Sequence, residues 1–167
     1  MVNENIFRKL RITLTRIFAV MLTILILITS SHWEDIGILS TIFFISGTAL
    51  VGIATIGRIW CALYISGYKS KILITSGPYS MCRNPLYFFS MIGSLGVGLA
   101  SETLTKPFIL MVGFALYYPY VIQREQRRLS ALYGDKYKEY CDKTPSFIPS
   151  LSLLYEPDDY IVKPVTI

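Results

Sequence analysis

Residues 71–87 read KILITSGPYSMCRNPLY and stand between two uncharged hydrophobic blocks. Gly77-Pro78 indicates a turn, because proline fixes its own φ angle and moves the preceding residue away from helix. Asn84-Pro85 is a second break, and a long apolar run begins at Leu86. Polar groups and irregular backbone at the mouth of a hydrophobic helix suggest a binding site. The alternative is a juxtamembrane loop whose one arginine serves membrane topology.

Composition indicates a membrane protein of one domain. The 167 residues are 53% hydrophobic, with a mean hydropathy of +0.49, whereas soluble domains contain about 45–50% apolar residues. The net charge of +5 comes from basic residues that lie at the ends of apolar blocks. That placement is typical of membrane topology and argues against a nucleic-acid partner.

Four apolar blocks predict an all-α, integral membrane bundle of about four transmembrane helices. Each block approaches the roughly 20 residues that a span needs, although the last two are shorter. A signal peptide is the alternative for the first block. That block is long for a signal peptide and has no evident cleavage site, so we expect a retained helix. The expected spans are 12–30, 36–56, 86–100 and 107–122, within a domain of residues 1–150.

Residues 123–149 are rich in charge and in good helix formers, so we expect a cytoplasmic helical segment after the fourth span. Its first helix is expected to end near Gly134, before a shorter piece that carries Tyr137 and Tyr140. Residues 151–167 are interpreted as a loosely held tail.

Basic residues alternate between the connections that join the spans. They precede the first span, are absent after it, return between the second and third spans, and are abundant after the fourth; only Lys106 lies between the third and fourth. The positive-inside rule then places both termini in the cytoplasm. Residues 71–87 and 123–149 fall on that same side.

Other candidate chemistry is weak. Cys61, Cys82 and Cys141 are too scattered for a CxxC motif, and His32 is the one histidine of the chain. We therefore expect neither a metal site nor histidine-based catalysis. The glycines within residues 93–98 favour close helix packing, with backbone approach by a cofactor as the alternative.

Two motifs resemble the signature of one group of membrane methyltransferases. Gly77-Pro78-Tyr79 and Arg83-Asn84-Pro85-Leu86-Tyr87 resemble its G-x-Y…R-[HN]-P-x-Y pattern. A second block, from Glu125-Gln126 to residues 145–149, resembles its C-terminal signature. The group contains isoprenylcysteine carboxyl methyltransferases and the related phospholipid methyltransferases. The resemblance covers residues 58–149 and implies an enzyme that uses S-adenosylmethionine.

The resemblance further implies that both motifs surround this methyl donor. Glu125 is suited to the amino group or ribose hydroxyls of the donor, and Tyr79 and Tyr87 are suited to its adenine or sulfonium. Backbone groups freed around Asn84-Pro85 can hydrogen-bond it. The expected cofactor-binding residues are Lys71, Ile72, Leu73, Ile74, Tyr79, Asn84, Pro85, Leu86, Tyr87 and Glu125.

Three departures from the family pattern bear on the methyl acceptor. Asn84 replaces the usual histidine and cannot act as a base near neutral pH. Gln126 replaces a second glutamate. Val121 stands where isoprenylcysteine enzymes have the arginine that meets the substrate carboxylate, and Arg124 is the nearest replacement. Arg83 remains suited to an anionic acceptor head.

We therefore expect Arg83 and Glu125 to act in catalysis, with a lipidic or small amphipathic acceptor drawn from the lipid bilayer. An isoprenylcysteine-type carboxylate or a thiol is favoured over a phospholipid amine. The alternatives are a phospholipid N-methyltransferase, an NADPH-dependent membrane reductase of related fold, and a non-catalytic membrane scaffold.

Overall fold

The computed structural model describes residues 37–66, 72–102 and 104–160, and the regular elements within them are helices. This part of the chain confirms the predicted all-α class. The three long helices are α2 (Gly37–Ile65), α4 (Pro85–Ala100) and α5 (Thr105–Tyr133). The shorter elements are α3 (Pro78–Met81), α6 (Asp135–Lys143) and the 3-10 helix η1 (Leu151–Leu153).

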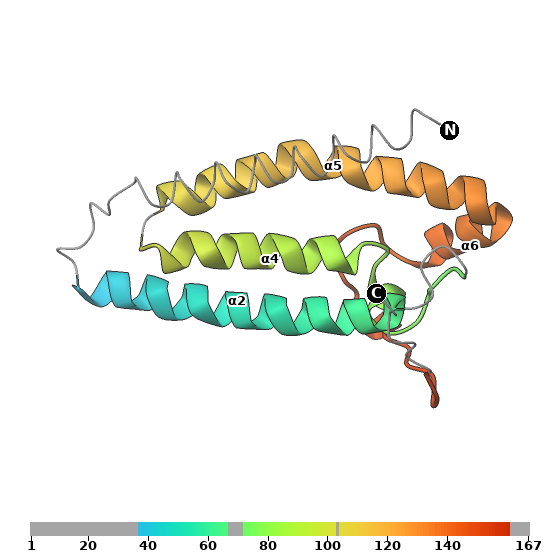
Figure 1. Ribbon diagram of the computed structural model, residues 1–167, viewed down its shortest axis with the longest axis horizontal. Helices are drawn as coiled ribbons and strands as arrows, with labels where there is room; N and C mark the ends of the chain where they lie inside the picture. Colours follow the sequence, from blue (N-terminus) through green and yellow to red (C-terminus); the bar gives the residue numbers. More distant parts are fainter. Residues whose placement is uncertain (1–36, 67–71, 103, 161–167) are drawn as a thin grey trace.

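The long helices lie side by side in one layer, with α4 between α2 and α5 (Figure 1). Only residues 101–104 separate α4 from α5, so these two helices run in opposite directions. The short elements α3 and α6 gather at the end of the layer where α2 ends and α4 begins (Figure 1). Both sequence motifs therefore meet at one end of the layer.

Two of the described helices, α2 and α5, are long and apolar enough to cross a membrane. Many of their large apolar side chains are exposed. Examples that are more than half exposed are Ile42, Ile56, Phe108 and Leu116. Exposed apolar surface of this extent is typical of a face covered by lipid. The span predicted at residues 86–100 coincides with the shorter α4, whereas the span at 12–30 lies outside the described residues. The number of four spans stays a prediction.

Glycines set the close approach of α2 and α4. A Cβ atom added to Gly96 would lie 2.7 Å from the Gly47 carbonyl oxygen and 2.9 Å from Leu50 Cβ, well inside van der Waals contact. Gly57 packs under the ring of Phe89 in the same way. Small residues allow membrane helices to pack backbone to backbone. This supports the packing interpretation of the glycines on α4.

Two of the helices extend beyond the segments that were predicted to span the membrane. α2 continues past residue 56 to Ile65. α5 does not stop at residue 122 but runs to Tyr133 as one helix, with Pro119 inside it. The change from apolar to charged residues near 123 reflects the surroundings of the helix, and good helix formers carry the backbone onward. Gly134 ends α5 with a positive φ of 51°, where we expected it to end.

The expectation of a loosely held tail was wrong for the part of the tail that the structure describes. The Gly77 amide donates to the Tyr155 carbonyl at 2.7 Å, and the Tyr155 amide donates to Ser80 Oγ at 2.9 Å. The ring of Tyr160 stacks on that of Tyr64 with centroids 4.3 Å apart, and its hydroxyl donates to the Tyr64 carbonyl. These contacts join the tail to α2 and to the first motif.

The glycine contact predicts a position-specific loss of stability. Gly96→Ala forces α2 and α4 apart, so we expect a cost of about 1–3 kcal/mol in the free energy of unfolding. Gly52→Ala is the matched control, because nothing lies within 4 Å of a Cβ atom there. We expect it to be neutral or to stabilise by roughly 0.5–1 kcal/mol. Thermal unfolding in detergent measures both, and equal melting temperatures for the two variants would contradict the packing role.

Candidate active site

The first motif opens with a turn whose backbone requires glycine. Gly77 has a φ of +60°, and the ring of Tyr64 occupies the space that a side chain would need. Pro78 takes the first position of α3, where a missing amide hydrogen costs nothing. Ser80 Oγ donates to the Gly77 carbonyl at 2.7 Å. The turn thus fixes where Tyr79 enters the site.

Tyr79 presents a buried hydroxyl that has no hydrogen-bond partner among the described residues. Its carbonyl accepts a hydrogen bond from the Tyr140 hydroxyl at 2.6 Å. Burial raises the pKa of both Tyr79 and Tyr140 above the ordinary value for a phenol. Tyr79 therefore keeps its proton at neutral pH and can donate it in a hydrogen bond to a ligand.

Asn84 joins the two motifs. Its side chain is buried, and its Nδ2 donates to the Ser146 carbonyl at 2.8 Å. Its own carbonyl accepts hydrogen bonds from the amides of Tyr87 and Phe88, and these bonds form the first turn of α4, which begins at Pro85. Asparagine serves here as a structural connection, a role for which an amide that donates and accepts is suited.

Arg83 connects the first motif to α6 and to the segment that follows α6. Its amide donates to the Pro145 carbonyl at 2.9 Å, and its Nη1 donates to Cys141 Sγ at 2.8 Å. Tyr137 also interacts with Arg83 and Cys141, and burial raises the pKa of Tyr137 to about 12. The Nε atom of Arg83 is buried without a partner among the described residues. One donor of the guanidinium is thus left for a ligand.

Glu125 lies on the last third of α5, half-exposed, 3.7 Å from Nη1 of Arg128. The next residue, Gln126, donates from Nε2 to Ser146 Oγ at 3.2 Å. Ser146 therefore contacts the side chains of both Asn84 and Gln126. This places Glu125 one residue from a side chain that reaches the junction of the two motifs.

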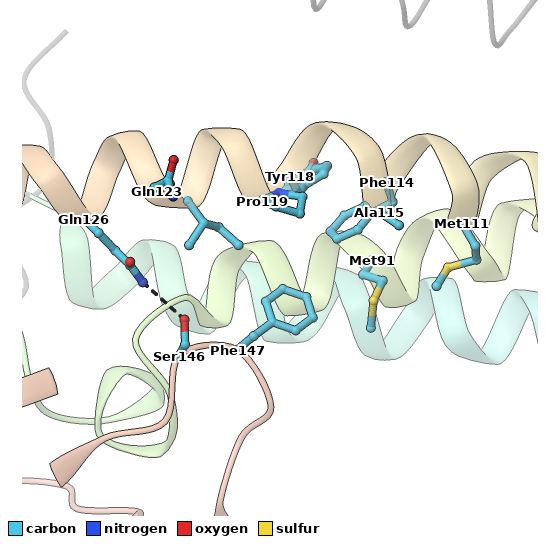
Figure 2. A pocket seen from close by; sticks show the side chains of 11 residues that line it. Met91, Met111, Phe114, Ala115, Tyr118, Pro119, Gln123, Gln126, Ser146 and Phe147 are labelled. Carbon is cyan, nitrogen blue, oxygen red and sulfur yellow. Dashed lines mark hydrogen bonds between the residues drawn. The ribbon is translucent and has the colours of Figure 1, made fainter. Parts of the chain in front are cut away.

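A cavity of about 480 Å³ lies between α4, α5 and the segment that follows α6. Its polar end is formed by Gln123, Gln126 and Ser146 (Figure 2). Its other end is lined by Met91 and Met111, and the wall between the ends is largely aromatic and aliphatic (Figure 2). A cavity that is mostly apolar with a few polar groups at one end suits an amphipathic ligand.

None of the predicted site residues that the structure describes lines this cavity. Tyr87 contacts the cavity residue Tyr118 edge-to-face, with centroids 5.3 Å apart. Leu86, beside Tyr87, is half-buried. Ile72 is exposed, and Leu73 and Ile74 are only partly buried, so this irregular segment lies at the surface. Lys71 lies outside the described residues.

The thiols show no sign of a reactive or metal-binding site. Cys61 and Cys82 are fully buried, and burial raises the pKa of Cys82 to about 11, which keeps it as a thiol at neutral pH. Within the described residues, no group of three or more His, Cys, Asp or Glu side chains is placed to hold a metal ion. Cys141 serves as a partner for Arg83.

Sequence reasoning missed several residues that shape the site. Tyr140 supports Tyr79 from α6, and Tyr118 lies between Tyr87 and the cavity. Ser146 belongs to the second block, but nothing in the sequence indicates that it joins Asn84 to Gln126. Met91 and Met111 could not be distinguished from other apolar residues of their helices.

The fold and the joined motifs agree with a comparison to protein families. Residues 14–136 match the model of the phospholipid methyltransferase family, and the chain belongs to that family. It is thus a membrane protein of a methyltransferase family, as the two motifs predicted.

Among individual relatives, the chain is 40% identical to a nickel-cobalt-cadmium resistance protein, NccN, of Alcaligenes xylosoxydans xylosoxydans, over 95% of this chain and 74% of NccN. It is 41% identical to a cobalt-zinc-cadmium resistance protein, CzcN, of Cupriavidus metallidurans, over 90% of this chain and 68% of CzcN. A protein-S-isoprenylcysteine O-methyltransferase of Schizosaccharomyces pombe is 28% identical over 48% of this chain and 34% of its own length.

The two neighbouring tyrosines predict opposite effects on stability. Tyr140→Phe removes a hydrogen bond and leaves the Tyr79 carbonyl unpaired, so we expect a loss of about 1 kcal/mol or more. Tyr79→Phe removes a buried hydroxyl that has no partner in the described chain, so we expect unchanged or slightly higher stability. Thermal unfolding of the ligand-free protein in detergent checks both. A larger loss for Tyr79→Phe than for Tyr140→Phe would show that the orphan hydroxyl is wrongly placed.

Proposed function

We propose that this protein transfers the methyl group of S-adenosylmethionine to a lipidic or small amphipathic acceptor at the cytoplasmic face of a membrane. The observation that carries the proposal is the hydrogen bond from Asn84 to Ser146, between residues 62 positions apart. It joins the two motifs of a methyltransferase family at one end of the helix layer, beside an apolar cavity. A scaffold has no need of that arrangement.

The donor is proposed to bind at the junction of the two motifs. Glu125 supplies a carboxylate for its amino group or ribose hydroxyls, and the Tyr79 hydroxyl supplies a buried donor. The ring of Tyr87 offers a π face for the adenine or the sulfonium. The exposed segment of Ile72, Leu73 and Ile74 flanks the same junction in the chain.

Methyl transfer needs orientation more than it needs acid–base groups. A lone pair of the acceptor attacks the methyl carbon as the bond from that carbon to the sulfonium breaks, and the sulfur leaves as a neutral thioether. In-line alignment of the two reactants and exclusion of water supply most of the acceleration. A carboxylate acceptor reacts without losing a proton, whereas a thiol or an amine must lose one.

The cavity is proposed to hold the apolar part of the acceptor. Its polar end faces the motif junction through Gln126 and Ser146, so an acceptor chain that enters it leaves its head near the donor. A carboxylate or thiol of the isoprenylcysteine type is favoured, since Arg83 retains a buried Nε donor for an anionic head. An amine acceptor would need a base, and Glu125, the carboxylate beside Gln126 at the motif junction, is assigned to the donor. The amine of a phospholipid is the second candidate, supported by the family match.

A contribution to metal tolerance is a second candidate function. It is favoured by the 40% and 41% identity to two metal resistance proteins. We propose that this contribution is made through a methylated product. An inactive variant that still folds would then fail to restore tolerance in a sensitive strain.

The membrane orientation is proposed to place both termini and the site in the cytoplasm. Impermeant thiol reagents test it after the three native cysteines have been replaced by serine. A cysteine introduced at position 32 should react from outside intact cells, and one at position 143 should react only after the cells are opened. The reverse pattern would contradict a cytoplasmic site.

Donor binding gives the direct test of the proposed function. Glu125→Ala should abolish binding of S-adenosylmethionine to the purified protein, because it removes the donor's anionic partner. Tyr87→Ala should weaken binding by about 1–3 kcal/mol through loss of ring contacts. Isothermal titration calorimetry measures both, with NADPH as the competing ligand; binding of NADPH in place of S-adenosylmethionine would favour a reductase.

Arg127→Ala is the matched control for these variants. Arg127 lies on the same helix turn as Glu125 and is exposed, so its loss should leave donor binding unchanged. Arg128 is unsuitable as a control because it contacts Glu125. Transfer of a labelled methyl group to an isoprenylcysteine analogue, a long-chain thiol and phosphatidylethanolamine then identifies the acceptor class. Equal loss of donor binding in all variants would indicate misfolding and remove support for a localised pocket.

A further inference from the structure

Arg58 is a cation inside a helix of membrane-spanning length. It lies on α2 seven positions before Ile65, where the helix ends, which is about 10 Å along the axis by the helical rise of 1.5 Å per residue. It follows the expected span at 36–56 by two positions and so lies where the apolar part of α2 ends. A charged side chain at the end of a membrane helix either reaches the interface or serves a site between helices.

The contacts of Arg58 run sideways across the helix layer. Its Nη1 donates to Ser90 Oγ on α4, and Ser90 Oγ donates to the Leu86 carbonyl at 2.7 Å. Tyr118 on α5 lies within interaction range of both Ser90 and Arg58. A lysine or arginine that served topology alone would extend its charge toward the membrane interface. The guanidinium is instead directed toward the neighbouring helix.

The partners of Arg58 in the described chain are neutral. The ion pairs found there are Arg128 with Glu125 and Lys143 with Glu139, and neither involves α2. A guanidinium has five N–H donors, and the hydrogen bond to Ser90 uses one of them. The residue is exposed, so the remaining donors are open to a ligand. An anionic oxygen group would satisfy them in two-pronged geometry.

Arg58 is also connected to the cavity. Tyr118, with which it interacts, lines the cavity and contacts Tyr87 of the first motif. The adjacent Gly57 lies under the ring of Phe89, which closes the gap between α2 and α4 at this level. One aromatic side chain thus separates the cation from the proposed acceptor site.

We propose that Arg58 binds an anionic oxygen group of the acceptor, a carboxylate or a phosphate, beside Ser90 and Tyr118. This inference rests on the proposed function. Arg58 would supply the positive charge that is missing because Val121 replaces an arginine. Arg83 provides that charge only in part, because its Nη1 is hydrogen-bonded to Cys141. Arg58 acts on acceptor binding and does not touch the donor.

Kinetics of two variants test this role in the full chain. Arg58→Met should raise the KM for the acceptor substrate by about 10- to 100-fold, the range expected for loss of charge-assisted hydrogen bonds. The Kd for S-adenosylmethionine should stay unchanged. Arg58→Lys should recover only part of the loss, because it keeps the charge without the fork. Arg127→Met, at an exposed position, should behave as the parent. An unchanged KM in Arg58→Met would overturn the assignment.

A binding measurement separates failure of this inference from failure of the proposed function. The chain has two tryptophans, and Trp33→Phe leaves Trp60, two positions from Arg58, as the reporter. Bromine atoms quench tryptophan fluorescence at short range. In nanodiscs, a dibrominated fatty acid in its ionised form should therefore quench the fluorescence of Trp60 at a lower mole fraction than the matching fatty alcohol does. Brominated phosphatidate against the matching diacylglycerol tests phosphate in the same way.

The preference for the anion should disappear in Arg58→Met and persist in Arg127→Met. The arm in which it appears identifies carboxylate or phosphate as the group bound. Equal quenching by anionic and neutral lipids in both arms, or a preference that survives Arg58→Met, would refute the inference even if methyl transfer is observed. A preference that depends on Arg58 without any methyl transfer would uphold the anion site and count against the proposed reaction.

Discussion

The hydrogen bond from Asn84 Nδ2 to the Ser146 carbonyl is the contact on which the site depends. Two motifs that are far apart in the chain have no reason to meet unless something joins them. Asn84 is buried, so the loss of this bond would leave a polar group unpaired away from water. A parallel backbone bond from the Arg83 amide to Pro145 holds the same two segments. Together they align the start of α4 with the segment that follows α6.

The packing of the helix layer fixes the position of that junction. α4 can lie against α2 only because Gly96 and Gly47 bring the two backbones together. The same contact places Phe89 over Gly57 and Ser90 within reach of Arg58. Packing in the middle of the layer therefore sets the position of polar groups near its end. Substitutions that separate the helices are expected to reach the site through this route.

Local signals in the sequence were sufficient for the features that depend on neighbouring residues. Pro85 begins α4 and Gly134 ends α5, as turn chemistry predicts. The span predicted to end at residue 122 belongs to a helix that continues to Tyr133, because hydropathy reports whether a helix segment faces lipid or water and not whether the backbone stays helical. The docking of Tyr155 and Tyr160 and the bridging role of Ser146 depend on contacts across the fold, which one sequence does not reveal. The roles of Tyr79 and Glu125 toward a donor stay predictions.

Pro119 gives α5 a mechanical property of its own. Proline has no amide hydrogen, so the carbonyl four residues earlier, at Ala115, lacks its helical partner. Both residues line the cavity, which therefore lies against a turn of α5 that lacks one backbone hydrogen bond. Glu125 and Gln126 lie beyond that turn. The backbone of α5 is therefore least constrained against bending at the turn that faces the cavity, so a molecule in the cavity contacts the helix at that turn.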